Sequence, residues 1–182
     1  MEDKFIEWLK SKKPGEILEL REYLMKYAGM MGIVALHASL SARVFRVDGS
    51  IEDRGIVAVH AVTDAFVAQL VDTLQSSVAT FSNYRYHDSG IGATAENKTD
   101  ATMDSACGDA RDSGTQIEGA TANIYKSVAT HTYGGTYAIV EHGLFNDSTV
   151  GILLDRSVLS AINVESGDKI EWTYQLTCTA GG

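Results

Sequence analysis

The sequence predicts a mainly β protein: an antiparallel β-sandwich or jelly-roll-like domain with one internal helix and an N-terminal α-helical arm. Segments that alternate apolar and polar residues recur at short spacing, as half-buried antiparallel strands do. Glycine occurs 17 times and proline once, at Pro14, a composition typical of sheets joined by tight turns. A chain of 182 residues suits one domain of this kind.

Residues 1–31 differ from the rest and are predicted to form an amphipathic helical arm. Apolar residues recur at helical spacing on both sides of Pro14-Gly15, which predicts two short helices. Either these helices pack on the domain's own core, or they dock onto a neighbouring subunit. The apolar run 28–36 is expected to be a buried segment. For docking, the expected partner-binding residues are Phe5, Trp8, Leu9, Tyr23 and Tyr27.

Residues 32–182 are predicted to form the β-sandwich domain. A first hairpin pairs 42–47 with 55–62 around the turn Asp48-Gly49-Ser50. Apolar residues at helical spacing then predict the internal helix over 64–76. Further strands are expected at 78–87, 116–132, 135–143, 150–154, 157–164 and 168–179.

Charge and hydropathy exclude two classes of partner. The chain has 15 Lys and Arg against 24 Asp and Glu, a net charge of −9, whereas a nucleic-acid-binding protein needs a basic surface. No apolar run reaches the roughly 18 residues that a membrane-spanning helix needs. We therefore expect no nucleic-acid and no membrane partner. The polar segment 88–114 is predicted to be a long acidic loop, and loops of this length are often functional.

No catalytic, cofactor-binding or metal site is predicted. The acidic residues of 96–112 lack the alternate spacing of an EF-hand calcium loop. Glu141 and His142 are adjacent, so they point to opposite faces of a strand. One considered group of metal-binding side chains, without any known ligand spacing, is His87, Asp88, Glu141 and His142.

The two cysteines and the glycine motifs likewise predict no catalytic or cofactor-binding site. Cys107 lies among acidic residues, which disfavour the reactive thiolate, and Cys178 is expected to be a packed small hydrophobe. They form no CxxC pair, and no GxSxG nucleophile motif is present. The segment Gly90-Ile-Gly92 lacks the third glycine of a nucleotide-binding loop and is predicted to be a turn.

Six sequence elements between Arg43 and the end of the chain carry a family resemblance. They are RVFRVDGSIEDRG (43–55), YHDSGIGATAEN (86–97), GTQIEGATANIY (114–125), AIVEHGLF (138–145), LDRSVLSAINV (154–164), and Gly167-Asp168 followed by TYQLT (173–177). Together they resemble a family of tailed-bacteriophage virion proteins and are similar in pattern to tail-collar and head-decoration proteins. The resemblance covers about three-quarters of the chain and leaves out residues 1–31.

The resemblance implies a non-enzymatic virion structural protein that decorates or cements the capsid shell as a homo-oligomer, with a trimer expected first. Its partners would be its own copies and the major capsid protein or other virion proteins, in particles assembled in the host cytoplasm. The same resemblance allows a tail, collar or fibre component at the neck. Within these elements, Asp155 and Arg156 are expected to pair with each other or with turn backbone, and Gly143 to permit a special backbone angle.

Two functions from other classes remain open. A sugar-binding host-attachment module would need an exposed aromatic platform beside acidic or amide side chains, for example Tyr84 and Tyr86 with Asp88 and Asn97. An enzyme would need a polar cleft that holds two of the five histidines.

Overall fold

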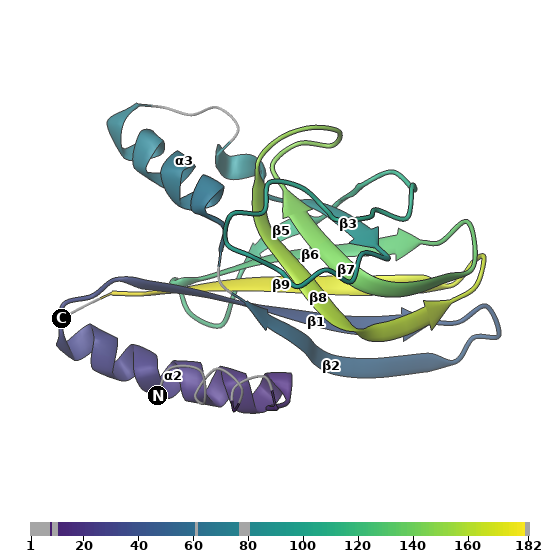
Figure 1. Ribbon diagram of the computed structural model, residues 1–182, viewed down its shortest axis with the longest axis horizontal. Helices are drawn as coiled ribbons and strands as arrows, with labels where there is room; N and C mark the ends of the chain where they lie inside the picture. Colours follow the sequence, from purple (N-terminus) through teal and green to yellow (C-terminus); the bar gives the residue numbers. More distant parts are fainter. Residues whose placement is uncertain (1–7, 9–10, 61, 77–80, 181–182) are drawn as a thin grey trace.

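Two antiparallel sheets packed face to face form the body of the molecule in this computed structural model, which describes residues 8, 11–60, 62–76 and 81–180 (Figure 1). Sheet A has the strand order β2-β1-β9-β6-β5, and sheet B has the order β4-β3-β7-β8. The predicted mainly β fold with a sandwich arrangement is confirmed. The strands are β1 (Ala35–Phe45), β2 (Ile51–His60), β3 (Tyr86–Gly90), β4 (Asp112–Ser113), β5 (Thr115–Glu118), β6 (Ile124–Thr132), β7 (Tyr137–Phe145), β8 (Leu153–Val164) and β9 (Lys169–Thr179).

Helices flank the sandwich at two places. The described helices are α2 (Pro14–Met30), α3 (Asp64–Gln75) and a single 3-10 turn, η1 (Phe81–Asn83). Helix α3 is the predicted internal helix, and its N-cap Thr63 accepts a hydrogen bond from the Phe66 N–H at 3.1 Å. Helix α2 packs against β1 and β2 (Figure 1). None of the helices among the described residues is long and apolar enough to cross a membrane.

The main core lies between the two sheets, and strict alternation builds it. On β9, Ile170, Trp172 and Tyr174 are fully buried, whereas the residues between them are half-exposed. They face apolar side chains of sheet B such as Ile139 and Leu144. Burying a large side chain of this kind contributes about 1.5–3 kcal/mol. The alternation that predicts the strands is therefore also what fills the core.

The strand predicted at 78–87 is wrong in its extent. Residues 81–83 form η1, and β3 begins only at Tyr86, while residues 77–80 lie outside the described part of the chain. The physical reason is an aromatic cluster: Phe81 stacks on Phe66 of α3 with ring centroids 6.0 Å apart. Contact with α3 overrides the alternating pattern of the sequence.

Two further strand boundaries also differ. The strand predicted at 116–132 is divided into β5 and β6 by a turn, in which the Gly119 N–H donates to the Ile124 carbonyl at 2.8 Å. The strand predicted at 150–154 is wrong over 150–152, and its last two residues continue through the strand predicted at 157–164 as one strand, β8 (Leu153–Val164). The pairing of β8 with β7 shifts register between Leu144 and Phe145. This shift allows one long strand to form although its alternation of apolar and polar residues is interrupted.

The acidic loop is shorter than predicted and spans 91–111, because β3 extends to Gly90 and β4 forms at Asp112. Asp88 can lie within a strand since Arg111 pairs with its carboxylate at 3.1 Å. The apolar run 28–36 is not buried as a whole: Met31 is 69% and Val34 is 70% exposed. The run joins α2 to β1 along the outside of the molecule.

Candidate functional site

A band of exposed apolar side chains covers the end of α2 and the segment that joins it to β1. Tyr23 and Tyr27 lie one helical turn apart, with ring centroids 4.9 Å apart and hydroxyls 3.0 Å apart. Each residue of the band is about half exposed or more. Apolar residues gathered on a surface in this way mark interaction sites. The band, called the α2 surface below, consists of Tyr23, Leu24, Tyr27, Met30, Met31, Ile33 and Val34.

The first half of α2 anchors the helix to the sandwich. Ile17 and Leu18 are half-buried, and α2 contacts β1 and β2. Arg21 turns towards the body, where burial lowers its pKa and the carboxylates of Asp155 and Glu96 oppose that effect. The first half of α2 therefore packs on the domain, and its end is exposed; docking of that end onto a neighbouring subunit stays a prediction.

The predicted partner-binding residues fall into two groups. Tyr23 and Tyr27 belong to the α2 surface, and Trp8 is 45% exposed with the Lys12 ammonium 5.0 Å from its ring centre. The other two residues of the prediction, Phe5 and Leu9, lie outside the described residues.

The aromatic platform considered for sugar binding does not form from the residues named for it. Tyr84 is 3% exposed and packs edge-on against Phe66 in the core. Tyr86 is half-buried and packs against a small cluster formed by Met103, Phe145 and Leu153.

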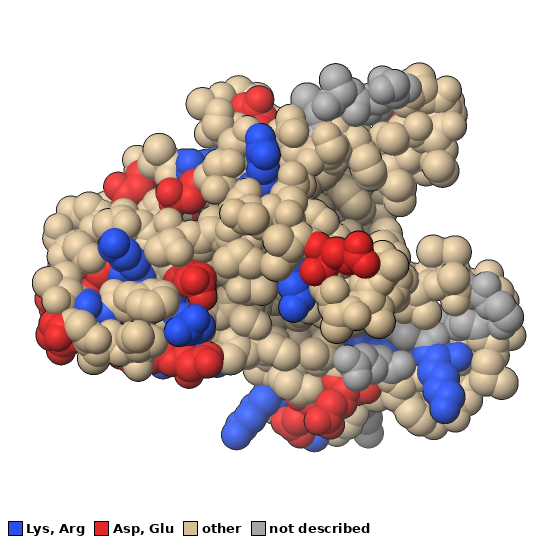
Figure 2. Space-filling view, turned by 180° about the vertical axis from the view of Figure 1, so that it is seen from behind, with Lys and Arg blue, Asp and Glu red and all other residues tan. Residues whose placement is uncertain are grey.

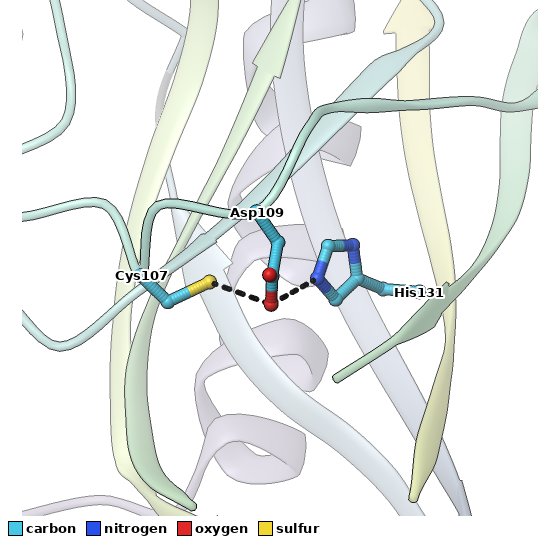
Figure 3. A group of neighbouring side chains, drawn as sticks. All are labelled: Cys107, Asp109 and His131. Atoms are coloured by element: carbon cyan, nitrogen blue, oxygen red, sulfur yellow. Dashed lines mark hydrogen bonds and ion pairs between the residues drawn. The ribbon is translucent and has the colours of Figure 1, made fainter. Parts of the chain in front are cut away.

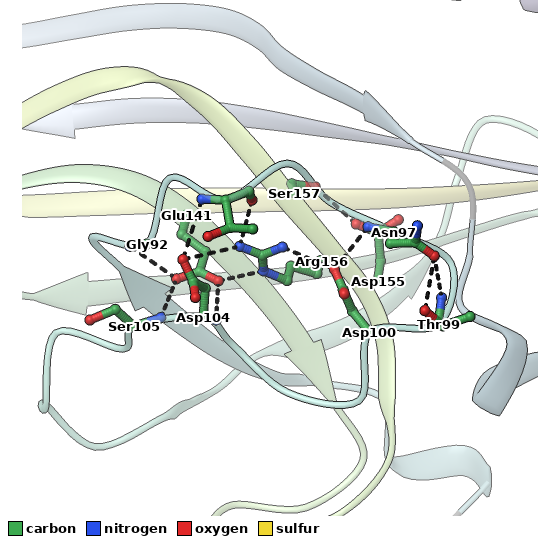
Figure 4. Close-up of polar contacts among 11 residues, drawn as sticks. Gly92, Asn97, Thr99, Asp100, Asp104, Ser105, Glu141, Asp155, Arg156 and Ser157 are labelled. Atoms are coloured by element: carbon green, nitrogen blue, oxygen red, sulfur yellow. Dashed lines mark hydrogen bonds and ion pairs between the residues drawn. The ribbon is translucent and has the colours of Figure 1, made fainter.

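A buried ion pair lies under loop 91–111, on the outer face of sheet B (Figure 4). Glu141 of β7 is completely buried, and its carboxylate accepts the backbone N–H groups of Asp104 and Ser105 as well as the Arg156 guanidinium. Arg156 of β8 also pairs with Asp100 at 2.9 Å and donates to the Thr94 carbonyl at 2.9 Å. These contacts fold the polar loop onto the sheet.

The expectations about these strands hold only in part. Asp155 and Arg156 do not pair with each other, because neighbours on β8 point to opposite faces: Asp155 accepts from the Ser157 hydroxyl at 2.9 Å (Figure 4). The alternative, a bond to backbone, holds for Arg156, which lies under the loop and donates to the Thr94 carbonyl. Gly143 has no positive φ. Its role is close approach, since a Cβ there would lie 2.5 Å from the Met103 sulfur.

His87 and His142 form a sealed pair between the two sheets. His87 Nδ1 lies 3.0 Å from His142 Nε2, and His87 Nε2 lies 2.8 Å from the Ser127 hydroxyl oxygen. Burial lowers the pKa of His87 to about 3. Burial, followed by the nearby His87, lowers the pKa of His142 as well. Both rings are 1% exposed or less, so no substrate reaches this pair.

The four side chains once considered as a metal group do not converge. Glu141 faces loop 91–111, whereas His142 on the opposite face of β7 contacts His87 and the Trp172 ring. Asp88 pairs with Arg111.

A different polar group lies where loop 91–111 meets β6. The Cys107 Sγ lies 3.9 Å from the Asp109 Oδ2, which lies 3.5 Å from the His131 Nε2 (Figure 3). The other ring nitrogen of His131 hydrogen-bonds Asp112. Burial alone would lower the pKa of His131, but its contacts with Cys107 and Asp112 raise it to about 9.

The most apolar cavity and the charged surface offer no reactive centre. A cavity of about 560 Å³ lies between α3 and the sandwich, and its lining includes Phe66, Tyr84 and Leu176 but no histidine, carboxylate or lysine. On the face seen in Figure 2, acidic and basic side chains are intermixed and form no basic patch.

The sequence pattern predicts neither the Glu141–Arg156 pair under loop 91–111 nor the group formed by Cys107, Asp109 and His131. Glu141 and Arg156 occupy outward positions of strands, and nothing in their spacing indicates that a loop covers that face. Asp109 and His131 lie 22 residues apart and meet only through the fold. The one local sequence pattern that indicates this group is the spacing of Cys107 and Asp109, which are separated by a single residue.

No protein-family model, no curated protein and no solved structure matches this chain.

Proposed function

We propose that this chain is a non-enzymatic phage virion structural protein that decorates or cements the capsid shell as a homo-oligomer. The observation that carries the proposal is the α2 surface: a group of exposed apolar side chains at the end of an anchored helix, which an isolated soluble domain would normally bury. Tyrosines enrich it, and tyrosines dominate the binding energy of many interfaces.

The rigidity of the body supports the same function. Strands from both ends of the sequence share sheet A, and buried polar groups between and outside the sheets are bonded to one another. A symmetric shell repeats one interface many times, so its subunits need a fixed shape. The α2 surface supplies that interface between copies.

The elements of the virion-protein resemblance meet in the fold. Asp168, from the Gly167-Asp168 element, accepts from the Arg46 guanidinium at 2.9 Å and from the Val47 N–H at 2.9 Å. Arg46 belongs to the RVFRVDGSIEDRG hairpin, 122 residues away in sequence. Residues that carry the resemblance thus tie the β1–β2 and β8–β9 turns together, as a structural role requires.

The proposal is tested by the copy number of the chain in purified particles of the phage that encodes it, measured by quantitative mass spectrometry against the major capsid protein. A copy number close to that of the capsid protein is expected for a shell protein. A dozen copies or fewer would overturn the shell position and favour the tail, collar or fibre alternative. Absence from the particles would overturn the virion proposal itself.

A paired variant links particle incorporation to the α2 surface. Tyr27→Asp with Met31→Asp places two charges on that surface and should abolish incorporation. The control is Leu74→Asp, at an 81% exposed position on α3, which should incorporate normally. Equal incorporation of the two variants would contradict the assigned interface.

A further inference from the structure

Three side chains with metal-binding atoms converge between loop 91–111 and sheet A. Cys107 and Asp109 lie on the loop, and His131 lies on β6. One ligand atom from each, a thiol sulfur, a carboxylate oxygen and an imidazole nitrogen, lies within 4.8 Å of the other two. Figure 3 shows the Cys107 sulfur and the His131 ring on either side of the Asp109 carboxylate.

Asp112 holds the His131 ring in the orientation that a metal ligand needs. Its carboxylate only accepts hydrogen bonds, so the His131 Nδ1 must carry the proton that they share. In the neutral ring this leaves a lone pair on Nε2, the nitrogen that faces Asp109 at 3.5 Å. A carboxylate behind the distal nitrogen of a ligating histidine is the usual outer partner in metal sites, where it sets the tautomer and raises ligand basicity.

The three donor atoms select the class of metal. A thiolate and an imidazole favour Zn²⁺ and related transition metals, whereas Mg²⁺ and Ca²⁺ prefer oxygen ligands alone. Zinc binds all three donor types in tetrahedral geometry. We infer that Cys107, Asp109 and His131 form a zinc-binding site, with Asp112 positioning His131 and a solvent molecule as the fourth ligand.

The site is accessible to an ion from one side. The His131 side chain is 4% exposed, but that of Asp109 is 29% exposed and Cys107 is half-buried. Asp109 also lies 3.4 Å from the Gly134 N–H, a contact that orients its carboxylate. Metal binding displaces the thiol proton of Cys107 and, below about pH 9, the Nε2 proton of His131 to solvent, so affinity rises with pH.

The bound ion would join the two sheets. The Cys107 N–H donates to the Ser89 carbonyl of β3 at 2.9 Å, and Ala106 pairs with Gly90, so this part of the loop continues the edge of sheet B. His131 belongs to sheet A. A metal held by both acts as a clip across the sandwich, which is independent of the α2 surface and of the proposed virion role.

Cobalt binding tests the site on the full chain, reduced and freed of metal by a chelator that is then removed. Co²⁺ is used as a spectroscopic substitute for Zn²⁺. We expect one Co²⁺ per chain with a sulfur-to-cobalt charge-transfer band in the near ultraviolet, and loss of the band when Zn²⁺ displaces the cobalt. Zinc at about a hundredfold excess over its Kd should raise the Tm by about 5–10 °C.

The two cysteines provide matched variants. Cys107→Ser should remove the charge-transfer band, whereas Cys178→Ser, at the exposed cysteine of β9, should keep it. Asp112→Asn should weaken zinc binding about 10–100-fold. If Cys107→Ser does not fold, Asp109→Asn at the partly exposed ligand should still lower the affinity. No band in the natural chain, or a band that survives Cys107→Ser, would overturn the inference.

Discussion

Sheet B and the α2 surface distribute polar and apolar groups in opposite ways. Under loop 91–111, charged groups are buried: Glu141 is 0% and Arg156 is 4% exposed. On the α2 surface, apolar groups are exposed, with Met30 at 73% and Val34 at 70%. The first region is costly unless each charge has a partner, and the second is costly unless another molecule covers it.

The difference separates a completed region from an incomplete one. Within sheet B, Glu141 receives three backbone N–H groups and one guanidinium, so the burial of its charge is compensated inside the chain. The α2 surface has no such internal partner for its apolar area among the described residues. Stability should therefore depend on the buried polar groups, whereas assembly should depend on the exposed apolar ones.

The largest expected effect on stability comes from breaking the buried ion pair. Arg156→Met leaves the Glu141 carboxylate buried without its cation, which should lower the free energy of unfolding by about 3–5 kcal/mol. The control, Arg43→Met, removes an exposed pair with Glu171 and should cost about 1 kcal/mol or less. Urea unfolding followed by the fluorescence of the buried Trp172 measures both. Equal losses would mean that loop 91–111 is not held by Arg156.

The close packing of loop 91–111 against sheet B can also be tested by adding a methyl group at Gly92. A Cβ at Gly92 would lie 2.7 Å from the Ser105 backbone nitrogen and 2.6 Å from a Glu141 oxygen. Gly92→Ala should therefore cost about 1–3 kcal/mol, seen as a lower Tm. Gly15→Ala has nothing within 4 Å and should leave the Tm unchanged or slightly raised. A neutral Gly92→Ala variant would contradict the close packing of loop against strand.

The histidine pair makes stability depend on pH. His87 and His142 have lowered pKa values in the folded chain, so below about pH 6.5 only the unfolded chain takes up their protons. The free energy of unfolding should fall between pH 6.5 and 4.5, approaching about 1.4 kcal/mol per pH unit for each histidine. The raised pKa of His131 acts at higher pH, since its contribution is fully present below 6.5 and is lost as the pH rises through about 9.

Urea titrations at several pH values between 6.5 and 4.5 measure this slope. His142→Gln removes one of the two titrating rings and should flatten the slope by about half. An unchanged slope in the variant would show that the pair is not the source.

The smallest effect on stability, and the largest on assembly, is expected at the α2 surface. Tyr27→Asp with Met31→Asp changes only exposed positions, so the free energy of unfolding of the single chain should shift by less than about 0.5 kcal/mol. A chemical denaturation curve at low concentration checks this. A loss of several kcal/mol would mean that these residues pack on their own domain.

The strands of the two sheets are largely predictable from the sequence, because the apolar residues that alternate along a strand are the residues that its inner face buries. On β9, the apolar residues Ile170, Trp172 and Tyr174 are the ones that the core buries. The alternating pattern predicts the wrong structure where tertiary contacts compete with it. Phe81 is the example, because it packs into the aromatic cluster of α3 instead of a strand.

The buried polar centres could not be predicted, since they depend on which strands become neighbours. Arg156 lies beside Glu141 only because β7 and β8 pair with shifted register, and a charged residue at an outward strand position normally faces water. Cys107 and His131 meet only because the loop continues sheet B while His131 belongs to sheet A. Local pattern carries no information on either contact.

The mass of the full chain in solution, measured by light scattering on a size-exclusion column over a range of concentrations, shows whether the α2 surface joins copies of the chain. We expect a homo-oligomer for the natural chain and for Leu74→Asp, and a monomer for Tyr27→Asp with Met31→Asp. A monomeric natural chain at every concentration, or an oligomer that the double variant leaves intact, would contradict the claim that the α2 surface joins copies of this protein.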